Sequence, residues 1–100
     1  MMLLTKENRS SLPALGSQDG EGDNAIAKVK FFTPDSNWTW YATEFDGEDT
    51  FFGLVQGFEE ELGYFSLSEL DNAKGPMGLK IERDRWFKPT SLKDLRGKAI

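Results

Sequence analysis

Apolar and polar positions alternate with a period of two on both sides of the polar stretch DGED at residues 46–49. The flanking segments, WTWYATEF and TFFGLVQGF, have the pattern of strands whose successive side chains point to opposite faces of a sheet. We therefore predict an antiparallel hairpin over residues 38–58. A two-residue turn would place Glu44 opposite Asp49, a cross-strand pair of like charges, so we expect the loop to span all of 46–49.

Both faces of this hairpin carry large apolar side chains, and we expect both to be at least partly covered. One face is predicted to carry Trp38, Trp40 and Ala42 with Phe51, Gly53 and Val55, and the other Tyr41 with Phe52 and Leu54.

Three further segments have the pattern of strands. Residues 26–33 are rich in β-branched and aromatic side chains and are followed by the turn sequence PDSN. The sequence GYFSL at 63–67 predicts a third strand of a meander. Residues 79–87, LKIERDRWF, alternate charged with apolar positions, which is typical of an edge strand.

Capping residues predict three short helices. Thr5 can cap the first, Ser66 stands three residues before a glutamate at the start of the second, and Thr90 or Ser91 can cap the last. The first two helices are expected over about residues 6–12 and 67–74.

These elements predict an α+β fold, a small antiparallel β meander with short helices at the N-terminus, after the third or fourth strand, and at the C-terminus. We expect one domain over residues 1–100, with a flexible acidic and glycine-rich loop at 16–24. The expected core comprises Phe31, Trp40, Phe52, Leu54, Phe65, Leu70 and Ile81.

Composition excludes much familiar chemistry. The chain has no cysteine and no histidine, so disulfides, the usual zinc sites and Ser/His or Cys/His nucleophile pairs are excluded. The opening MMLL is too short for a signal-peptide core or a membrane span. We expect a cytoplasmic protein with no membrane partner, and the sequence leaves its oligomeric state open.

Charge changes sign along the chain. Residues 31–73 carry ten acids and no base, whereas residues 74–100 carry eight bases and three acids, within a net charge of −5. The acidic middle and the basic tail can pair internally once folded, or the acids can form a face that meets a basic partner protein. The partner-binding hypothesis rests on Asp46, Glu48, Asp49, Glu59, Glu60 and Glu61.

Other chemistry at the acids is disfavoured. The hairpin tip lacks the ligand spacing of a calcium loop, and we expect no metal and no cofactor. Glu44 and Asp49 would need a cleft to act as an acid–base pair, and Ser66 and Ser68 are better explained as helix caps than as nucleophiles. We expect no catalytic residues, and the sequence favours a non-catalytic protein.

A nucleic-acid-binding function is the alternative. Basic residues surround a tryptophan in the C-terminal part, and stacking with basic contacts is how single strands are bound. Trp38 and Trp40, by contrast, are expected to be core residues beside acids that repel phosphate. The alternative site comprises Lys80, Arg83, Arg85, Trp86 and Lys88.

The order of segments is specific. The run FFTPDSNWTWYATEFDGEDTFFGLVQGFEEELGYFSLSEL, followed by GPMGLKIERDRWFKP and preceded by LLTKENRSSLPAL, closely resembles the bacterial domain-of-unknown-function family twenty-nine fifty-eight. The resemblance spans nearly the whole chain. It implies an accessory protein encoded on plasmids, phages or integrative elements, and it transfers no catalytic residue. By analogy with small acidic proteins of such elements, it also implies a counter-defence function against a basic host protein.

Overall fold

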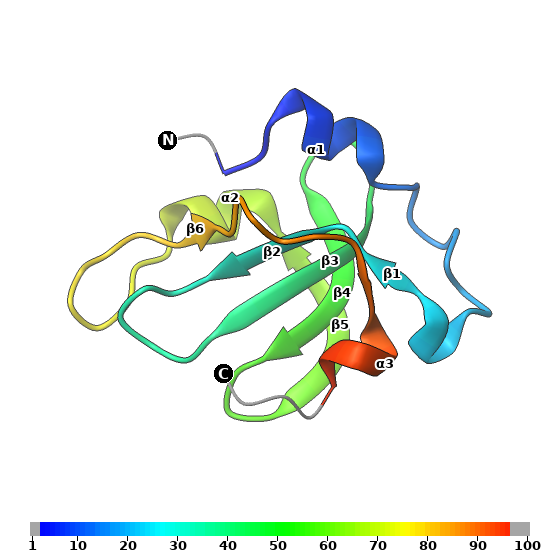
Figure 1. Cartoon of the computed structure of the whole chain (residues 1–100). Helices are drawn as coiled ribbons and strands as arrows, with labels where there is room; N and C mark the ends of the chain where they lie inside the picture. The colour runs from blue at the N-terminus through cyan, green and yellow to red at the C-terminus, as the bar shows by residue number, and fades with distance from the viewer. Residues whose placement is uncertain (1–2, 97–100) are drawn as a thin grey trace.

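The computed structural model describes residues 3–96, and its main element is a five-stranded antiparallel sheet (Figure 1). The strand order is β5-β4-β3-β2-β6, and β1 and β7 form a separate two-stranded sheet. The described strands are β1 (Ile26–Ala27), β2 (Val29–Phe32), β3 (Thr39–Phe45), β4 (Thr50–Gln56), β5 (Glu60–Ser66), β6 (Glu82–Arg83) and β7 (Thr90–Ser91).

The predicted hairpin is confirmed, with residues 46–49 as its loop between β3 and β4. Tyr41 lies opposite Leu54 and Ala42 opposite Gly53, as the alternation predicts. Beyond Ala42 the register shifts by one residue, because Thr43 is an extra residue on β3. Such a bulge reverses the alternation in the rest of the strand.

Short helices begin at the predicted caps. In α1 (Lys6–Ser11) and α2 (Leu67–Asn72) the caps are Thr5 and Ser66. Ser91 caps α3 (Leu92–Leu95), and a 3-10 turn, η1, covers Gly22–Asn24. Each capping oxygen accepts a hydrogen bond from a backbone N–H that the helix leaves unpaired.

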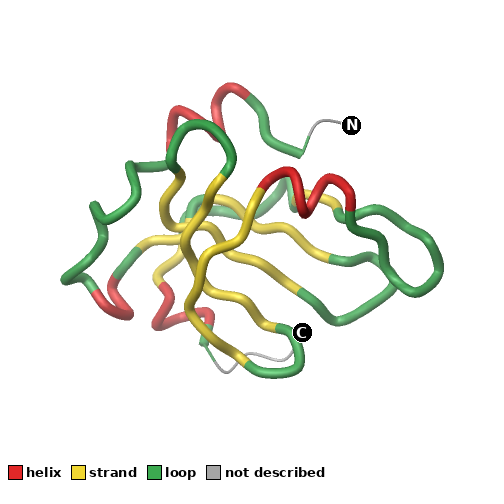
Figure 2. The backbone as a smooth tube through the Cα atoms, turned by 180° about the vertical axis from the view of Figure 1, so that it is seen from behind, coloured by secondary structure: helices red, strands yellow, loops and turns green. Residues whose placement is uncertain are grey.

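Helices cover both faces of the sheet, as expected. Figures 1 and 2 show α1 and α2 on one side and α3 on the other. The first side buries a cluster around Phe31 and Phe51, whose rings lie 5.5 Å apart. The second side buries a smaller cluster around Leu54 and Leu92, where η1 and β1 also pack.

Three sequence-based expectations need correction. Residues 26–33 form two short strands, β1 and β2, which belong to different sheets. The break between them is at Lys28, whose backbone N–H donates to Ala42 O of β3 at 2.8 Å. Of the expected 79–87 strand, Glu82–Arg83 alone joins the five-stranded sheet, at its edge beside β2, while Lys80 forms an isolated bridge with Lys74. Trp38, Trp40 and Phe52, expected in the core, are only partly buried.

Between residues 3 and 96, no helix is both long and apolar enough to cross a membrane.

Candidate functional site

The hairpin-tip acids are placed by local hydrogen bonds. Asp46 Oδ1 accepts from the backbone N–H groups of Glu48 and Asp49, both at 2.8 Å, and of Thr50 at 3.0 Å. These donors favour the ionised form and lower the pKa of Asp46 below its ordinary value of 3.8. Asp46 therefore fixes the loop, while Glu48 extends into solvent.

Asp49 joins the same loop to α2. Its carboxylate accepts from the backbone N–H of Ser68 at 2.8 Å and from the Ser68 hydroxyl at 3.0 Å. Its carbonyl accepts from Leu67 N at 2.8 Å. Two of the three tip acids thus have structural partners in addition to their charge.

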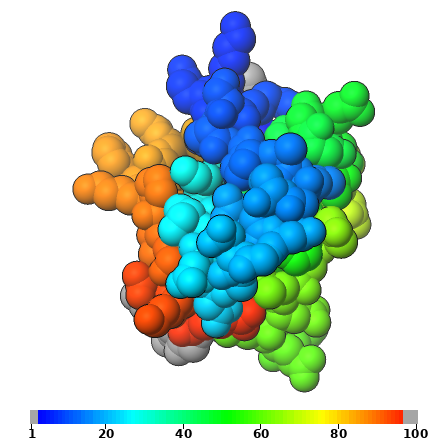
Figure 3. Space-filling model, turned by 90° about the vertical axis from the view of Figure 1, so that its right-hand side faces the viewer, coloured from blue at the N-terminus to red at the C-terminus, as the bar shows by residue number. Residues whose placement is uncertain are grey.

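The second acidic group, Glu59 to Glu61, lies at the other end of β4, where the β4–β5 turn leads into β5. Figure 3 shows the β3–β4 loop and the β4–β5 turn at separate places along one side of the molecule. Glu60 accepts from Gln56 Nε2 at 2.8 Å and lies 3.5 Å from Arg96 Nη1, an ion pair between the acidic middle and the basic tail. Glu59 and Glu61 are exposed. The six proposed acids therefore form two groups rather than one.

An aromatic patch, defined as Trp38, Trp40 and Phe58, lies beside this second group. The rings of Trp38 and Trp40 stack with centroids 5.8 Å apart, and Phe58 meets Trp38 edge to face at 5.4 Å. Phe58 is 95% exposed, and both tryptophans are partly exposed. The patch is thus an accessible group of three rings.

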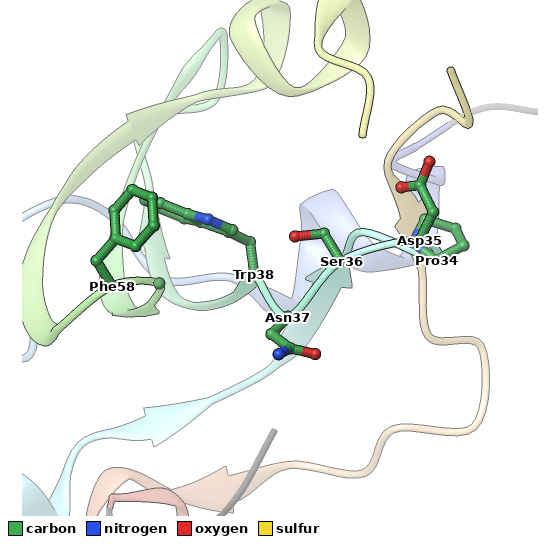
Figure 4. A pocket seen from close by; sticks show the side chains of 7 residues that line it. Pro34, Asp35, Ser36, Asn37, Trp38 and Phe58 are labelled. Carbon is green, nitrogen blue, oxygen red and sulfur yellow. The ribbon is translucent and has the colours of Figure 1, made fainter. Parts of the chain in front are cut away.

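Residues 34–38 and 57–58 line an open hollow of about 700 Å³ (Figure 4). The Trp38 ring lies over Gly57, where a Cβ would come within 2.4 Å of it. The backbone N–H of Trp38 donates to Thr33 Oγ1 at 3.1 Å, which fixes the end of the turn. The hollow therefore has a constrained aromatic wall.

Asp35 holds the other end of this turn. Its Oδ2 accepts from Met77 N at 2.7 Å, and its Oδ1 is buried against Gly75 with no hydrogen bond among the described residues. Figure 4 shows its carboxylate pointing away from Trp38. Asp35 thus positions the 75–79 segment, and its charge is directed away from the aromatic wall.

The basic residues of the alternative site are divided. Arg83 donates to Leu3 O at 2.9 Å, which ties it to the N-terminal segment. Arg83, Arg85 and Trp86 nevertheless line one open groove of about 360 Å³. Lys30, Glu82 and Asp84 line it too, and Lys30 lies 3.7 Å from Asp84. Trp86 is 85% exposed. Lys80 and Lys88 are exposed but are not among the residues that line this groove.

Glu44 is the buried charge that sequence reasoning missed. It is 2% exposed, and its carboxylate accepts from Gly16 N at 2.8 Å and from Gln18 N at 2.7 Å. Because its oxygens bind this loop while those of Asp49 bind α2, the two carboxylates do not form the acid–base pair considered from sequence. Ser66 caps α2 and accepts from Glu69 N at 3.0 Å.

Phe58 was also missed as a surface residue. It follows Gln56-Gly57 in a turn that is otherwise acidic, and an aromatic residue in a polar turn is the signal that marks it. Within residues 3–96, no group of three or more acids is arranged to hold a metal ion.

Fold and surface together define a small antiparallel-sheet protein with short helices and an exposed aromatic patch. The chain belongs to the family described as "Protein of unknown function (DUF2958)", which matches residues 3–94. No curated protein and no solved structure matches it.

Proposed function

We propose that this protein is a non-catalytic protein-binding module that recognises a basic segment of a partner through the aromatic patch and its neighbouring acids. The observation that carries the proposal is the 95% exposure of Phe58, which stands against Trp38. An aromatic ring in water gains free energy when a partner covers it, and aromatic residues are enriched at the centres of interfaces.

Charge around the patch specifies the chemistry of the partner. Trp40 pairs across the sheet with Val55, and Val55 pairs with Glu61, so all three side chains share one face. Glu59 is exposed in the adjoining turn. A lysine or arginine can place its alkyl stem on the rings and its charge near these carboxylates, which combines apolar burial with cation–π attraction.

The remaining acids contribute mainly to steering. A net charge of −5 attracts a basic partner over distance. Asp46, Glu48, Asp49 and Glu60 add to that field, although three of them also have structural partners. Their contribution should appear in the association rate more than in the lifetime of the complex.

The proposed biological setting is the bacterial cytoplasm. The resemblance to proteins of plasmids, phages and integrative elements supports an accessory role there, with a basic host protein as partner. A host protein whose basic surface binds DNA would fit an acidic mimic, which is the counter-defence form of the proposal.

The test uses a lysine- and arginine-rich peptide labelled with a fluorophore. We expect Phe58→Ala to weaken peptide binding at least about tenfold, because it removes the exposed ring. Trp86→Ala is the matched control, since Trp86 is an exposed aromatic residue elsewhere on the surface. Equal affinities of wild type and Phe58→Ala would contradict the proposal.

Nucleic-acid binding by the C-terminal part is the second candidate. It is favoured by the 85% exposure of Trp86 beside Arg85. It predicts the opposite pattern in titrations with a single-stranded oligonucleotide. Trp86→Ala should lose binding, and Phe58→Ala should bind like the wild type. Absence of oligonucleotide binding by the wild type at low salt would remove this candidate.

A further inference from the structure

Strand β5 forms one edge of the five-stranded sheet and pairs with β4 over seven consecutive residues without a register shift. The other edge strand, β6, is only two residues long. Natural edges are protected by charges, proline, bulges or short length. The middle of β5, Leu62-Gly63-Tyr64, has none of these features.

The outward backbone groups of β5 can be identified from the ends of its ladder. Leu67 N donates to Asp49 O, and Gly57 N donates to Glu59 O. Because hydrogen-bonded pairs alternate along an antiparallel ladder, Gly63 directs its N–H and C=O toward β4. Leu62 and Tyr64 therefore direct theirs away from the sheet.

The side chains at these outward positions are apolar and exposed. Leu62 is 40% exposed and Tyr64 is 71% exposed. Tyr64 meets Phe52 edge to face at 5.0 Å, so the edge continues an apolar strip on the face of Phe52. A strand added here would gain both backbone hydrogen bonds and apolar contacts.

We infer that two copies of this chain associate through β5, pairing antiparallel about Gly63 to form a continuous ten-stranded sheet. In this register Leu62 of each copy lies opposite Tyr64 of the other, and Gly63 lies opposite Gly63. Glu60 faces Ser66 and Glu61 faces Phe65, so no acid faces an acid. The segment is thus complementary to itself, as a twofold interface requires.

This register also satisfies the backbone. The outward groups of Leu62 and Tyr64 hydrogen-bond to each other across the twofold axis, and Gly63 falls at the close, non-hydrogen-bonded position. A register centred on Glu61 instead of Gly63 would place Glu61 of one copy opposite Glu61 of the other. Such a cross-strand pair of like charges is unfavourable. The interface is centred on Gly63 and does not use Phe58, although Glu61 belongs both to its ladder and to the carboxylates beside the aromatic patch.

The first test is sedimentation equilibrium over concentrations up to about 1 mM, a range that resolves weak association. We expect a mass approaching two chains of 11.3 kDa each. Leu62→Pro should shift the protein to monomer while circular dichroism stays unchanged, because its N–H points outward and is not used in the β4 ladder. A monomeric wild type throughout would overturn the inference.

The second test remains informative if Leu62→Pro fails to fold. The chain has no cysteine, and a Cβ at Gly63 has nothing within 4 Å. Gly63→Cys should form a disulfide-linked dimer when an added oxidant accepts two electrons and two protons from the two thiols, since facing Cα atoms lie about 4.5 Å apart.

Tyr64→Cys is the matched control. Its two copies would be diagonal neighbours about 7 to 8 Å apart, at the limit of disulfide reach, and should cross-link far more slowly. Equal cross-linking rates of the two variants, or none for Gly63→Cys, would overturn the inferred register.

Discussion

The carboxylate of Asp49 accepts hydrogen bonds from both the backbone N–H and the hydroxyl of Ser68, at 2.8 and 3.0 Å. This contact joins the β3–β4 loop to the first turn of α2. Asp49 is therefore a capping residue for α2 as well as a surface charge of the hairpin tip.

Asp49→Ala should lower the free energy of unfolding by about 1 to 2 kcal/mol, the usual effect of losing a helix cap. Glu48→Ala, at the exposed neighbour, should change it by less than about 0.5 kcal/mol. Urea denaturation of both variants measures the difference. Equal effects would show that the bonds to Ser68 do not stabilise the protein.

The Asp46 carboxylate should make stability depend on pH at the acid end. Its folded-state pKa is lowered below 3.8 by backbone hydrogen bonds from Glu48, Asp49 and Thr50. Its stabilisation is therefore fully present above the unfolded-state pKa near 3.8 and is lost as pH falls through the lower folded-state value. Carboxyl-carbon NMR titration should show the lowered pKa, and Asp46→Asn should flatten the fall of Tm in this window. A pKa at or above 3.8 would contradict the loop geometry.

Gly53 and Gly63 face each other on β4 and β5 but differ in available space. A Cβ at Gly53 would lie 1.8 Å from Tyr41 O, whereas one at Gly63 has nothing within 4 Å. Gly53→Ala should therefore cost at least about 2 kcal/mol, because strand backbone must shift. Gly63→Ala should stay within about 0.5 kcal/mol. Thermal unfolding of the pair checks this, and a tolerated Gly53→Ala would contradict the β3–β4 packing.

Glu44 should hold the 16–20 segment in place. Glu44→Ala leaves the N–H groups of Gly16 and Gln18 without their acceptors, at a cost of about 2 to 4 kcal/mol. Amide exchange at these two residues should accelerate. Glu21→Ala is the control, because Glu21 is an exposed acid of the same loop with no capping bond. Unchanged exchange at Gly16 and Gln18 would contradict this role.

Local chemistry predicted the hairpin and the helix starts. The like charges of Glu44 and Asp49 excluded the short turn, and Thr5, Ser66 and Ser91 are polar residues that satisfy unpaired N–H groups within their own segment. Such signals are local, so a single sequence contains them.

The bulge and the strand break depend on distant residues. The extra residue at Thr43 turns Glu44 toward the Gly16 loop and brings Phe45 against Phe51, with centroids 4.5 Å apart. The break at Lys28 lets β1 pair with β7, whose residues lie more than sixty positions away. Period-two alternation carries no signal for either, so the buried charge and the second sheet were not predicted.

The partial exposure of Trp38 and Trp40, which were expected in the core, was missed for a related reason. A tryptophan on a strand face is buried only if another element covers it. Here Leu4 and Leu12, which flank α1, and Leu70 of α2 belong to the buried cluster of Phe31 and Phe51. Trp38 and Trp40 stay partly exposed. The extent of that cover is set by packing rather than by the strand itself.

The most direct test of the binding proposal is an NMR titration of the three indole N–H signals with the lysine- and arginine-rich peptide. The three tryptophans lie at two separate places, Trp38 and Trp40 in the aromatic patch and Trp86 in the C-terminal groove. We predict that the signals of Trp38 and Trp40 shift with one saturable affinity while that of Trp86 stays in place. A shift confined to Trp86, or no shift at any indole, would contradict the account.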